Sequence, residues 1–149
     1  MPVIVVGADT PIGSEIISEL AGGGELRAFA TDPRQGEIFR RQGCKVALGD
    51  VSDGSHVELA ALECFTAVLI AQATVDDRER SFADSPSEVG RAWMEAVTGA
   101  GVQRMIWVGS HDYPDPPTPI TVTEVAVVSD AADGVAREVA RLNELDQLS

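Results

Sequence analysis

The residues whose types and spacing could do chemistry form a glycine turn near the start of the chain. A β-branched run at residues 3–6 leads into Gly7-Ala8-Asp9-Thr10-Pro11-Ile12-Gly13 and then into apolar residues at helical spacing. A dinucleotide-binding turn uses three glycines: one for the tight turn, one for close approach of the backbone to a pyrophosphate, and one for close packing of helix on strand. Gly7 and Gly13 match the first and third, and Thr10 stands at the second. The turn therefore predicts a nucleotide-binding fold whose pyrophosphate contact depends on Thr10.

Thr10 has two interpretations that the sequence leaves open. Its branched side chain would obstruct the approach of backbone to phosphate, although its hydroxyl could itself donate a hydrogen bond to a phosphate oxygen. Alternatively, Thr10 is the N-cap of the following helix and Pro11 is the first helical residue, a strong local signal that needs no ligand.

The elements that would position this turn alternate between strand and helix patterns. Strands are expected at residues 3–6, 26–30, 45–48, 67–71 and 105–108. Helices are expected at 12–20, at 33–42 with Asp32 as N-cap, at 55–63 from the capping-box spacing of Ser55 and Glu58, and around Val89, Trp93 and Val97. Five strands separated by helices predict an α/β fold, a doubly wound parallel sheet of strand order 3-2-1-4-5 in three layers.

The last part of the chain is less regular. Prolines between residues 114 and 119 indicate a stiff loop. Residues 120–128 are rich enough in β-branched side chains for a sixth strand, which we favour, although the segment could also begin a helix. Residues 133–145 predict a final helix with Val135, Val139 and Leu142 facing inward.

Length and composition predict one domain over residues 1–149, because 44% hydrophobic residues suffice for a core. The net charge of −13 repels phosphate backbones and anionic membranes, so we expect no nucleic-acid partner and no membrane association. The chain begins directly in a strand and has no apolar run near the ~20 residues of a membrane span. Cys44 and Cys64 lack metal-ligand spacing and are expected to be buried, reduced thiols of a cytoplasmic protein.

With these elements placed, the chain resembles the atypical, NmrA-like branch of the short-chain dehydrogenase/reductase superfamily. The resemblance covers roughly residues 1–110. It lies in the glycine turn, in Gly-Asp-Val-Ser-Asp at 49–53, in Thr-Ala-Val-Leu-Ile at 66–70, and in residues 99–110. It implies a Rossmann-type fold with a nicotinamide dinucleotide across the carboxyl ends of the first, second and fourth strands. It also implies reductase or epimerase chemistry, although some relatives are redox sensors that bind cofactor without turnover.

The resemblance also implies which residues would hold NAD or NADP. Asp32 matches an acid that binds the ribose hydroxyls, which favours NAD over NADP, although helix capping explains it equally; Arg34 is the nearby cation that could compensate. Asp50 and Val51 match positions that hold the adenine, and Ala71 and Gln72 lie beside the expected pyrophosphate and nicotinamide ribose. The candidate cofactor-binding residues are Gly7, Thr10, Pro11, Ile12, Gly13, Asp32, Arg34, Asp50, Val51, Ala71 and Gln72.

Catalysis is where the sequence departs from this family. The superfamily uses a serine after the fifth strand and a tyrosine acidified by a lysine four residues later. Ser110 matches the serine, but the only tyrosine, Tyr113, is followed four residues later by Pro117, and the only lysine is Lys45. Ser110 and Tyr113 are therefore the candidate catalytic residues, without a complete set.

Two other catalytic arrangements are not expected. The adjacent Ser110-His111-Asp112 would not form a triad, because neighbouring residues in an extended chain point in alternate directions. The chain has two histidines, His56 and His111, and neither has a cluster of ligands nearby, so no metal site is predicted.

Three functions remain open from the sequence. The first is a dinucleotide-binding module without turnover, such as a redox or metabolite sensor. The second is an oxidoreductase or epimerase with unusual acid and base groups, and the third is a scaffold whose dinucleotide site is lost at Thr10. The family's usual substrate-binding lobe is missing from the sequence, and we expect a homodimer that pairs through the helix carrying Trp93 and Met94 together with the final helix.

Overall fold

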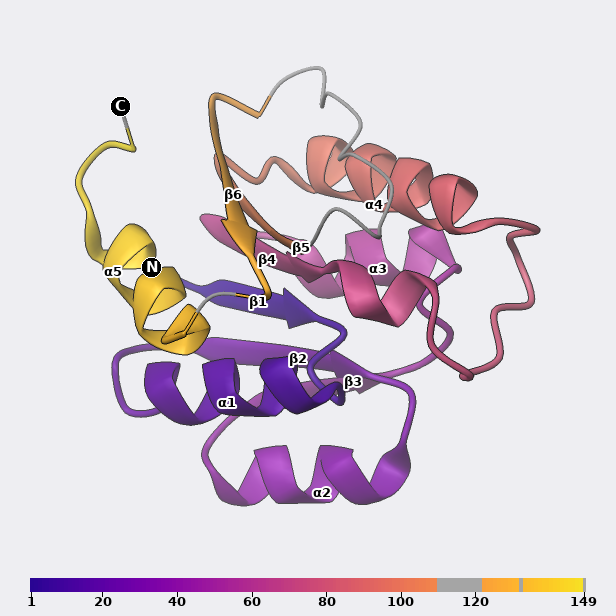
Figure 1. Ribbon diagram of the computed structural model, residues 1–149, viewed down its shortest axis with the longest axis horizontal. Coiled ribbons are helices and arrows are strands. Elements are labelled where there is room, and N and C mark those ends of the chain that lie inside the picture. The colour runs from indigo at the N-terminus through magenta and orange to yellow at the C-terminus, as the bar shows by residue number, and fades with distance from the viewer. Residues whose placement is uncertain (110–121, 132, 149) are drawn as a thin grey trace.

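A six-stranded, all-parallel sheet of order β3-β2-β1-β4-β5-β6 forms the centre of the molecule (Figure 1). The computed structural model describes residues 1–109, 122–131 and 133–148. The predicted doubly wound fold and its strand order are confirmed, and the sixth strand lies parallel to β5. The strands are β1 (Val3–Val6), β2 (Leu26–Ala30), β3 (Lys45–Leu48), β4 (Thr66–Ile70), β5 (Arg104–Gly109) and β6 (Glu124–Ser129).

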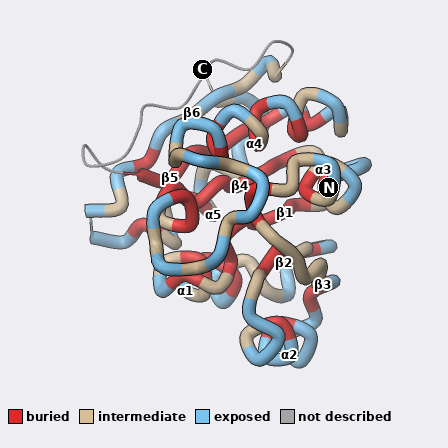
Figure 2. The backbone as a smooth tube through the Cα atoms, turned by 90° about the vertical axis from the view of Figure 1, so that its right-hand side faces the viewer, coloured by how far each residue is buried: buried red, intermediate tan, exposed pale blue. Residues whose placement is uncertain are grey.

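Helices cover both faces of the sheet. The helices are α1 (Pro11–Leu20), α2 (Pro33–Arg41), α3 (Gly54–Ala61), α4 (Pro86–Ala100) and α5 (Val135–Glu144), and a single 3-10 turn, η1 (Ala71–Thr74), follows β4. Apolar side chains of α1, α2 and α5 pack on one face, and those of α3 and α4 pack on the other. Figure 2 shows the resulting burial, with red concentrated along the central strands.

This topology defines where a ligand can bind. The chain moves from β1 outward to β2 and β3, then returns to β4 on the other side of β1. The connections on the two sides of this point run in opposite directions, and such a switch point opens a crevice at the carboxyl ends of the strands. The glycine turn directly follows β1, so it lies at this crevice.

Two local differences from the sequence predictions have simple causes. Helix α3 begins at Gly54 with Asp53 as its N-cap, because the Asp53 carboxylate accepts a hydrogen bond from the His56 N–H. The predicted start at Ser55 is therefore wrong by one residue, and the helix ends at Ala61. Strand β4 ends one residue earlier than predicted because Ala71 begins the turn η1.

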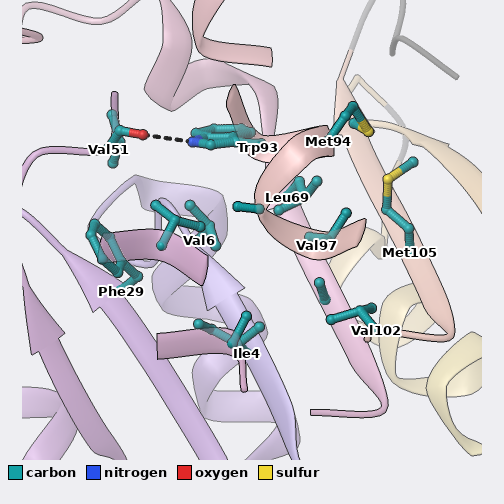
Figure 3. Packing of buried hydrophobic residues seen from close by; sticks show 14 of the residues in the cluster. Ile4, Val6, Phe29, Val51, Leu69, Trp93, Met94, Val97, Val102 and Met105 are labelled. Atoms are coloured by element: carbon teal, nitrogen blue, oxygen red, sulfur yellow. Dashed lines mark hydrogen bonds between the residues drawn. The ribbon is translucent and has the colours of Figure 1, made fainter. Parts of the chain in front are cut away.

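The core beneath the crevice contains a buried hydrogen bond between α4 and the loop after β3. Trp93 of α4 is fully buried, and its indole N–H donates to the carbonyl of Val51, with 2.8 Å between nitrogen and oxygen (Figure 3). Met94 is also buried, at 4% exposure. Trp93 and Met94 are therefore committed to the chain's own core, so the expected homodimer would have to use other residues, and it stays a prediction.

Arg104 of β5 connects this strand to β6 and to α5. Its side chain is fully buried, its Nε donates to Glu124 of β6, and its Nη1 donates to the carbonyls of Leu142 and Asn143 in α5. The final helix is thus attached to β5 and β6. It lies beside α1, with Val135 and Val139 buried and Leu142 partly buried as predicted.

Both cysteines are free and buried, as predicted. Burial raises the pKa of Cys44, and it raises the pKa of Cys64 to about 11, so neither thiol favours its reactive thiolate form at neutral pH. Across the described ranges, no helix has the length and apolar character needed to cross a membrane. No group of three or more His, Cys, Asp or Glu side chains in the described part of the chain is arranged to hold a metal ion.

Candidate functional site

Steric limits explain both glycines of the turn. Gly7 has a φ of 85°, and a Cβ there would lie 2.8 Å from the Cβ of Ala73. A Cβ on Gly13 would lie 2.4 Å from the carbonyl oxygen of Gly7, which is backbone and cannot easily move. Both positions therefore require glycine, one for the turn after β1 and one for the close contact of α1 with that turn.

Thr10 caps helix α1. Its hydroxyl accepts a hydrogen bond from the Gly13 N–H at 3.0 Å and donates its proton to the Gly7 carbonyl at 2.8 Å. The residue is 2% exposed, and Pro11 follows as the first helical residue. The capping interpretation is confirmed. Because the hydroxyl proton is used within the turn, Thr10 would have to break its bond to Gly7 before it could donate to a phosphate.

Asp9 is a functional candidate that sequence reasoning missed. One of its carboxylate oxygens accepts the backbone N–H groups of Thr31 at 2.8 Å and Asp32 at 3.0 Å. Its other oxygen accepts from Arg78 Nη1 at 2.8 Å, and its side chain is only 4% exposed. Asp9 thus links the carboxyl ends of β1 and β2 to the segment that follows η1.

Arg78 is the centre of a network of ion pairs over this edge of the sheet. Besides Asp9, it binds both oxygens of Asp76 and donates to the hydroxyl of Thr31 at 3.2 Å. Arg80 also binds Asp76. Burial opposes the charge of Asp76, but hydrogen bonds from Arg78 and Arg80 hold the pKa of its carboxyl below the ordinary value. Burial likewise opposes the charge of Arg78, but Asp76 and Asp9 raise its pKa.

Asp50, the expected adenine-binding residue, is held by the same segment. Its Oδ1 accepts from the N–H and hydroxyl of Ser52, at 2.8 and 2.5 Å, and its Oδ2 accepts the Ser81 N–H at 2.7 Å. The Ser52 hydroxyl also accepts the N–H of Phe82 at 3.0 Å. Burial would raise the pKa of Asp50, but these hydrogen bonds from Ser52 and Ser81 lower it, so the carboxyl is held as a carboxylate.

Residues 76–82, which we call the edge segment, therefore bind all three loops that leave β1, β2 and β3. The contacts reach Asp9, Thr31, Asp50 and Ser52. The loops after β2 and β3 are expected to hold the adenosine end of a dinucleotide, and the turn after β1 is expected to face its pyrophosphate. The sequence signals for this contact are an acid inside the glycine turn and two arginines in the polar stretch after the fourth strand, neither of which indicates a pairing by itself.

The remaining cofactor candidates also lie at this edge. Asp32 caps α2 by accepting the Arg34 N–H at 2.9 Å, and both residues are exposed at the end of β2. Val51 is buried in the loop after β3 and uses its carbonyl to accept from Trp93. Ala71 is buried in η1, and the adjacent Gln72 is partly exposed. The topology thus brings these candidates to one edge of the sheet.

The catalytic candidates Ser110 and Tyr113, and also His111, lie outside the described residues. The chain's only lysine lies far from the carboxyl edge: Lys45 begins β3 at the opposite edge and pairs with Glu25 at 3.0 Å. His56 packs edge to face on Phe29, with ring centroids 5.0 Å apart, so it has a packing role.

A match to a family model identifies the family of the chain. A family model described as NAD(P)H-binding matches residues 7–144, which include the glycine turn, the edge segment and α5. The chain belongs to this NAD(P)H-binding family. The resemblance to NmrA-like, Rossmann-type NAD(P)-binding proteins is thereby confirmed. No protein among those with curated functions matches the sequence significantly.

Solved structures share the fold at low sequence identity. Triphenylmethane reductase of Citrobacter sp., solved with NADP(H), is 17% identical, has a TM-score of 0.61 and aligns over 74% of this chain and 38% of its own. The NADPH-dependent quinone oxidoreductase QOR2 of Escherichia coli, solved with NADPH, is 19% identical, with a TM-score of 0.58 over 72% of this chain and 36% of its own. The present chain therefore spans little more than a third of the length of these two proteins.

A third structure matches over nearly its whole length. ChuY, described as an anaerobillin reductase from Escherichia coli O157:H7, is 17% identical and has a TM-score of 0.72. The alignment covers 100% of this chain and 93% of ChuY. At these identities the likeness shows the fold alone, but it also shows that this fold occurs at nearly the present length.

Proposed function

We propose that this chain binds a nicotinamide dinucleotide across the carboxyl ends of β1, β2 and β4, as a binding module that does not turn over a substrate. A redox or metabolite sensor is such a module. The observation that carries the proposal is the glycine turn. Gly7 and Gly13 are sterically required there, and they bring the N-terminus of α1 to the switch point between β1 and β4. Membership of the NAD(P)H-binding family supports the same ligand class.

The candidate residues would divide the ligand among four loops. The turn from Gly7 to Gly13, with Thr10, Pro11 and Ile12, would face the pyrophosphate, because the N-terminus of α1 carries the positive end of the helix dipole. Asp32 and Arg34 would lie near the adenine ribose. Asp50 would exchange the Ser81 N–H for the amino group of the adenine, with Val51 beside it. Ala71 and Gln72 would lie near the nicotinamide ribose.

The position of Lys45 supports binding without turnover. In the superfamily's usual chemistry, a lysine four residues after the tyrosine lowers the pKa of the phenol so that it can transfer a proton. Lys45 is the only lysine of this sequence, and it is paired with Glu25 at the edge of the sheet opposite the proposed site. The chain's own lysine is therefore not positioned to activate a proton donor beside the nicotinamide.

Binding and turnover can be tested separately on the unmodified protein. Calorimetry and thermal unfolding with NAD(H), NADP(H), FAD and adenine nucleotides should show binding of a nicotinamide dinucleotide and a rise in Tm, because a ligand of the folded state stabilises it by mass action. Asp50→Ala should weaken this binding, whereas Asp77→Ala, which removes an exposed acid of the edge segment, should leave it unchanged. Oxidation of NADH or NADPH with aldehydes, ketones or quinones should stay at background.

Two results would contradict the proposal. An unchanged Tm at millimolar dinucleotide, together with no heat of binding, would favour the scaffold whose site is lost. Robust oxidation of NADH or NADPH that disappears in Ser110→Ala or Tyr113→Phe would favour an enzyme.

The match to ChuY favours a reductase as the second candidate function, because that protein is described as a reductase and aligns over 93% of its own length. In this case Ser110, Tyr113 and Gln72 are the candidate acid and base groups. Reduction of an anaerobillin by NADH or NADPH, measured with and without the chain, tests this candidate directly.

A further inference from the structure

We propose that Asp9 selects the dinucleotide, because its carboxylate occupies the place where a phosphate on the adenine ribose would bind. The site would then take NAD(H) in preference to NADP(H). This inference rests on the proposed function, and it assigns to Asp9 the discrimination that the sequence suggested for Asp32.

The donors around Asp9 form an anion site. Two backbone N–H groups, from Thr31 and Asp32, and the guanidinium of Arg78 converge on its two oxygens at 2.8 to 3.0 Å. Backbone N–H groups together with an arginine are the typical ligands of a phosphate group in proteins. The two N–H groups lie at the carboxyl end of β2, where a Rossmann-type fold places the adenine ribose and any phosphate on it, and Arg78 reaches Asp9 from the edge segment. The internal carboxylate of Asp9 therefore already fills this site.

The positive charges of this site are already paired with carboxylates. Arg78 is shared between Asp9 and Asp76, and Arg80 pairs with Asp76, so two arginines balance two carboxylates. A ribose phosphate would bring roughly two further negative charges against Asp9, which is 4% exposed and therefore poorly screened by water. Arg34 is exposed and lies nearby, but it does not belong to this network as the structure describes it.

The uncharged ribose hydroxyls of NAD(H) are not repelled by Asp9. A hydroxyl can donate to a carboxylate, so NAD(H) can bind beside Asp9 without displacing it from Thr31, Asp32 and Arg78. The ion pair can therefore remain intact in the complex with NAD(H). Replacing Asp9 by alanine would free two backbone N–H groups and the Nη1 of Arg78 for a phosphate, while Arg78 stays paired with Asp76.

Calorimetric titration of the full chain with NAD⁺, NADP⁺, 5′-AMP and 2′,5′-ADP tests the inference. The unmodified protein should bind NAD⁺ at least about tenfold more tightly than NADP⁺. Asp9→Ala should tighten binding of NADP⁺ and 2′,5′-ADP about tenfold, with little change for NAD⁺ and 5′-AMP. Asp9→Asn removes the charge while keeping the shape, and it should show the same direction if Asp9→Ala is too unstable to study. Adding Arg78→Gln to either variant should abolish the gain, and Asp77→Ala is the control for loss of an exposed acid.

These titrations distinguish a failure of selection by Asp9 from a failure of dinucleotide binding itself. If the unmodified protein binds NADP⁺ as tightly as NAD⁺, or if both folded Asp9 variants bind NADP⁺ no better, Asp9 does not select the ligand. Those results would leave dinucleotide binding itself intact. If neither the unmodified protein nor any variant binds a dinucleotide, the proposed function and this inference both fail.

Discussion

At the scale of single residues, Thr10 combines a structural role with a place at the proposed pyrophosphate site. Thr10→Gly removes a hydroxyl that bonds Gly7 and Gly13, so the free energy of unfolding should fall by up to about 1 kcal/mol. The same change removes a branched side chain from the path of the phosphate, so binding of a dinucleotide should tighten. Urea unfolding and calorimetry measure the two effects. Thr10→Ser, which keeps the hydroxyl, should leave the stability nearly unchanged, and unchanged or weaker binding by Thr10→Gly would mean that Thr10 does not obstruct the ligand.

The sequence separation between hydrogen-bond partners explains which residue roles were predictable. The cap at Thr10 joins residues three apart, and the cap at Asp32 joins residues two apart, so local patterns reveal both. Asp9 finds its partners 22 to 69 residues away, and Asp50 meets Ser81 across 31 residues. No spacing rule connects such pairs. They depend on how the loops meet at the edge of the sheet.

At the scale of elements, α4 holds the loop after β3 in place through Trp93. Trp93→Phe would keep most of the packing but leave the buried carbonyl of Val51 without its partner, which should lower the free energy of unfolding by about 1–3 kcal/mol. Because Val51 adjoins Asp50, binding of 5′-AMP should weaken as well. Urea unfolding and calorimetry test both effects against Met94→Leu, a volume-conserving change on the same helix that should cost less than about 1.5 kcal/mol. A free energy of unfolding of Trp93→Phe equal to that of the unmodified protein would show that the hydrogen bond is unimportant.

The elements themselves were largely predictable because their apolar residues follow the period of each structure. Strands β1, β2 and β3 lie where the pattern indicated, and β6 is a strand parallel to β5 rather than a helix. The start of α3 was misplaced because Ser55 and Glu58 imitate a capping box, whereas the carboxylate of Asp53 makes the actual cap. The turn η1 was missed because a single turn contains too few residues to show a period.

At the scale of the whole molecule, the acidic edge of the sheet should make stability fall in acid. The pKa values of Asp50 and Asp76 are lower in the folded state than their ordinary value of about 3.9. The unfolded chain therefore binds protons first, so the stabilisation is complete above about pH 5 and is lost as pH falls through 4 toward the lower folded values. Urea midpoints measured from pH 7 to pH 3 should show this fall. Asp76→Asn should flatten the fall and Asp77→Asn should not; equal slopes in both variants would exclude Asp76 as its source.

The edge segment has a consequence for the speed of ligand capture. Ser81 donates its N–H to Asp50 and Phe82 donates its N–H to Ser52, so residues 81–82 lie against the side chains where the adenine would dock. These two residues would have to separate from Asp50 and Ser52 before the adenine can dock fully. The association rate would then level off at high ligand concentration, at the rate at which these residues open. Arg78 can stay with Asp9 throughout, so only part of the segment has to move. The molecule would admit its ligand by a small hinge movement beside a fixed ion pair, with each binding event waiting for that movement.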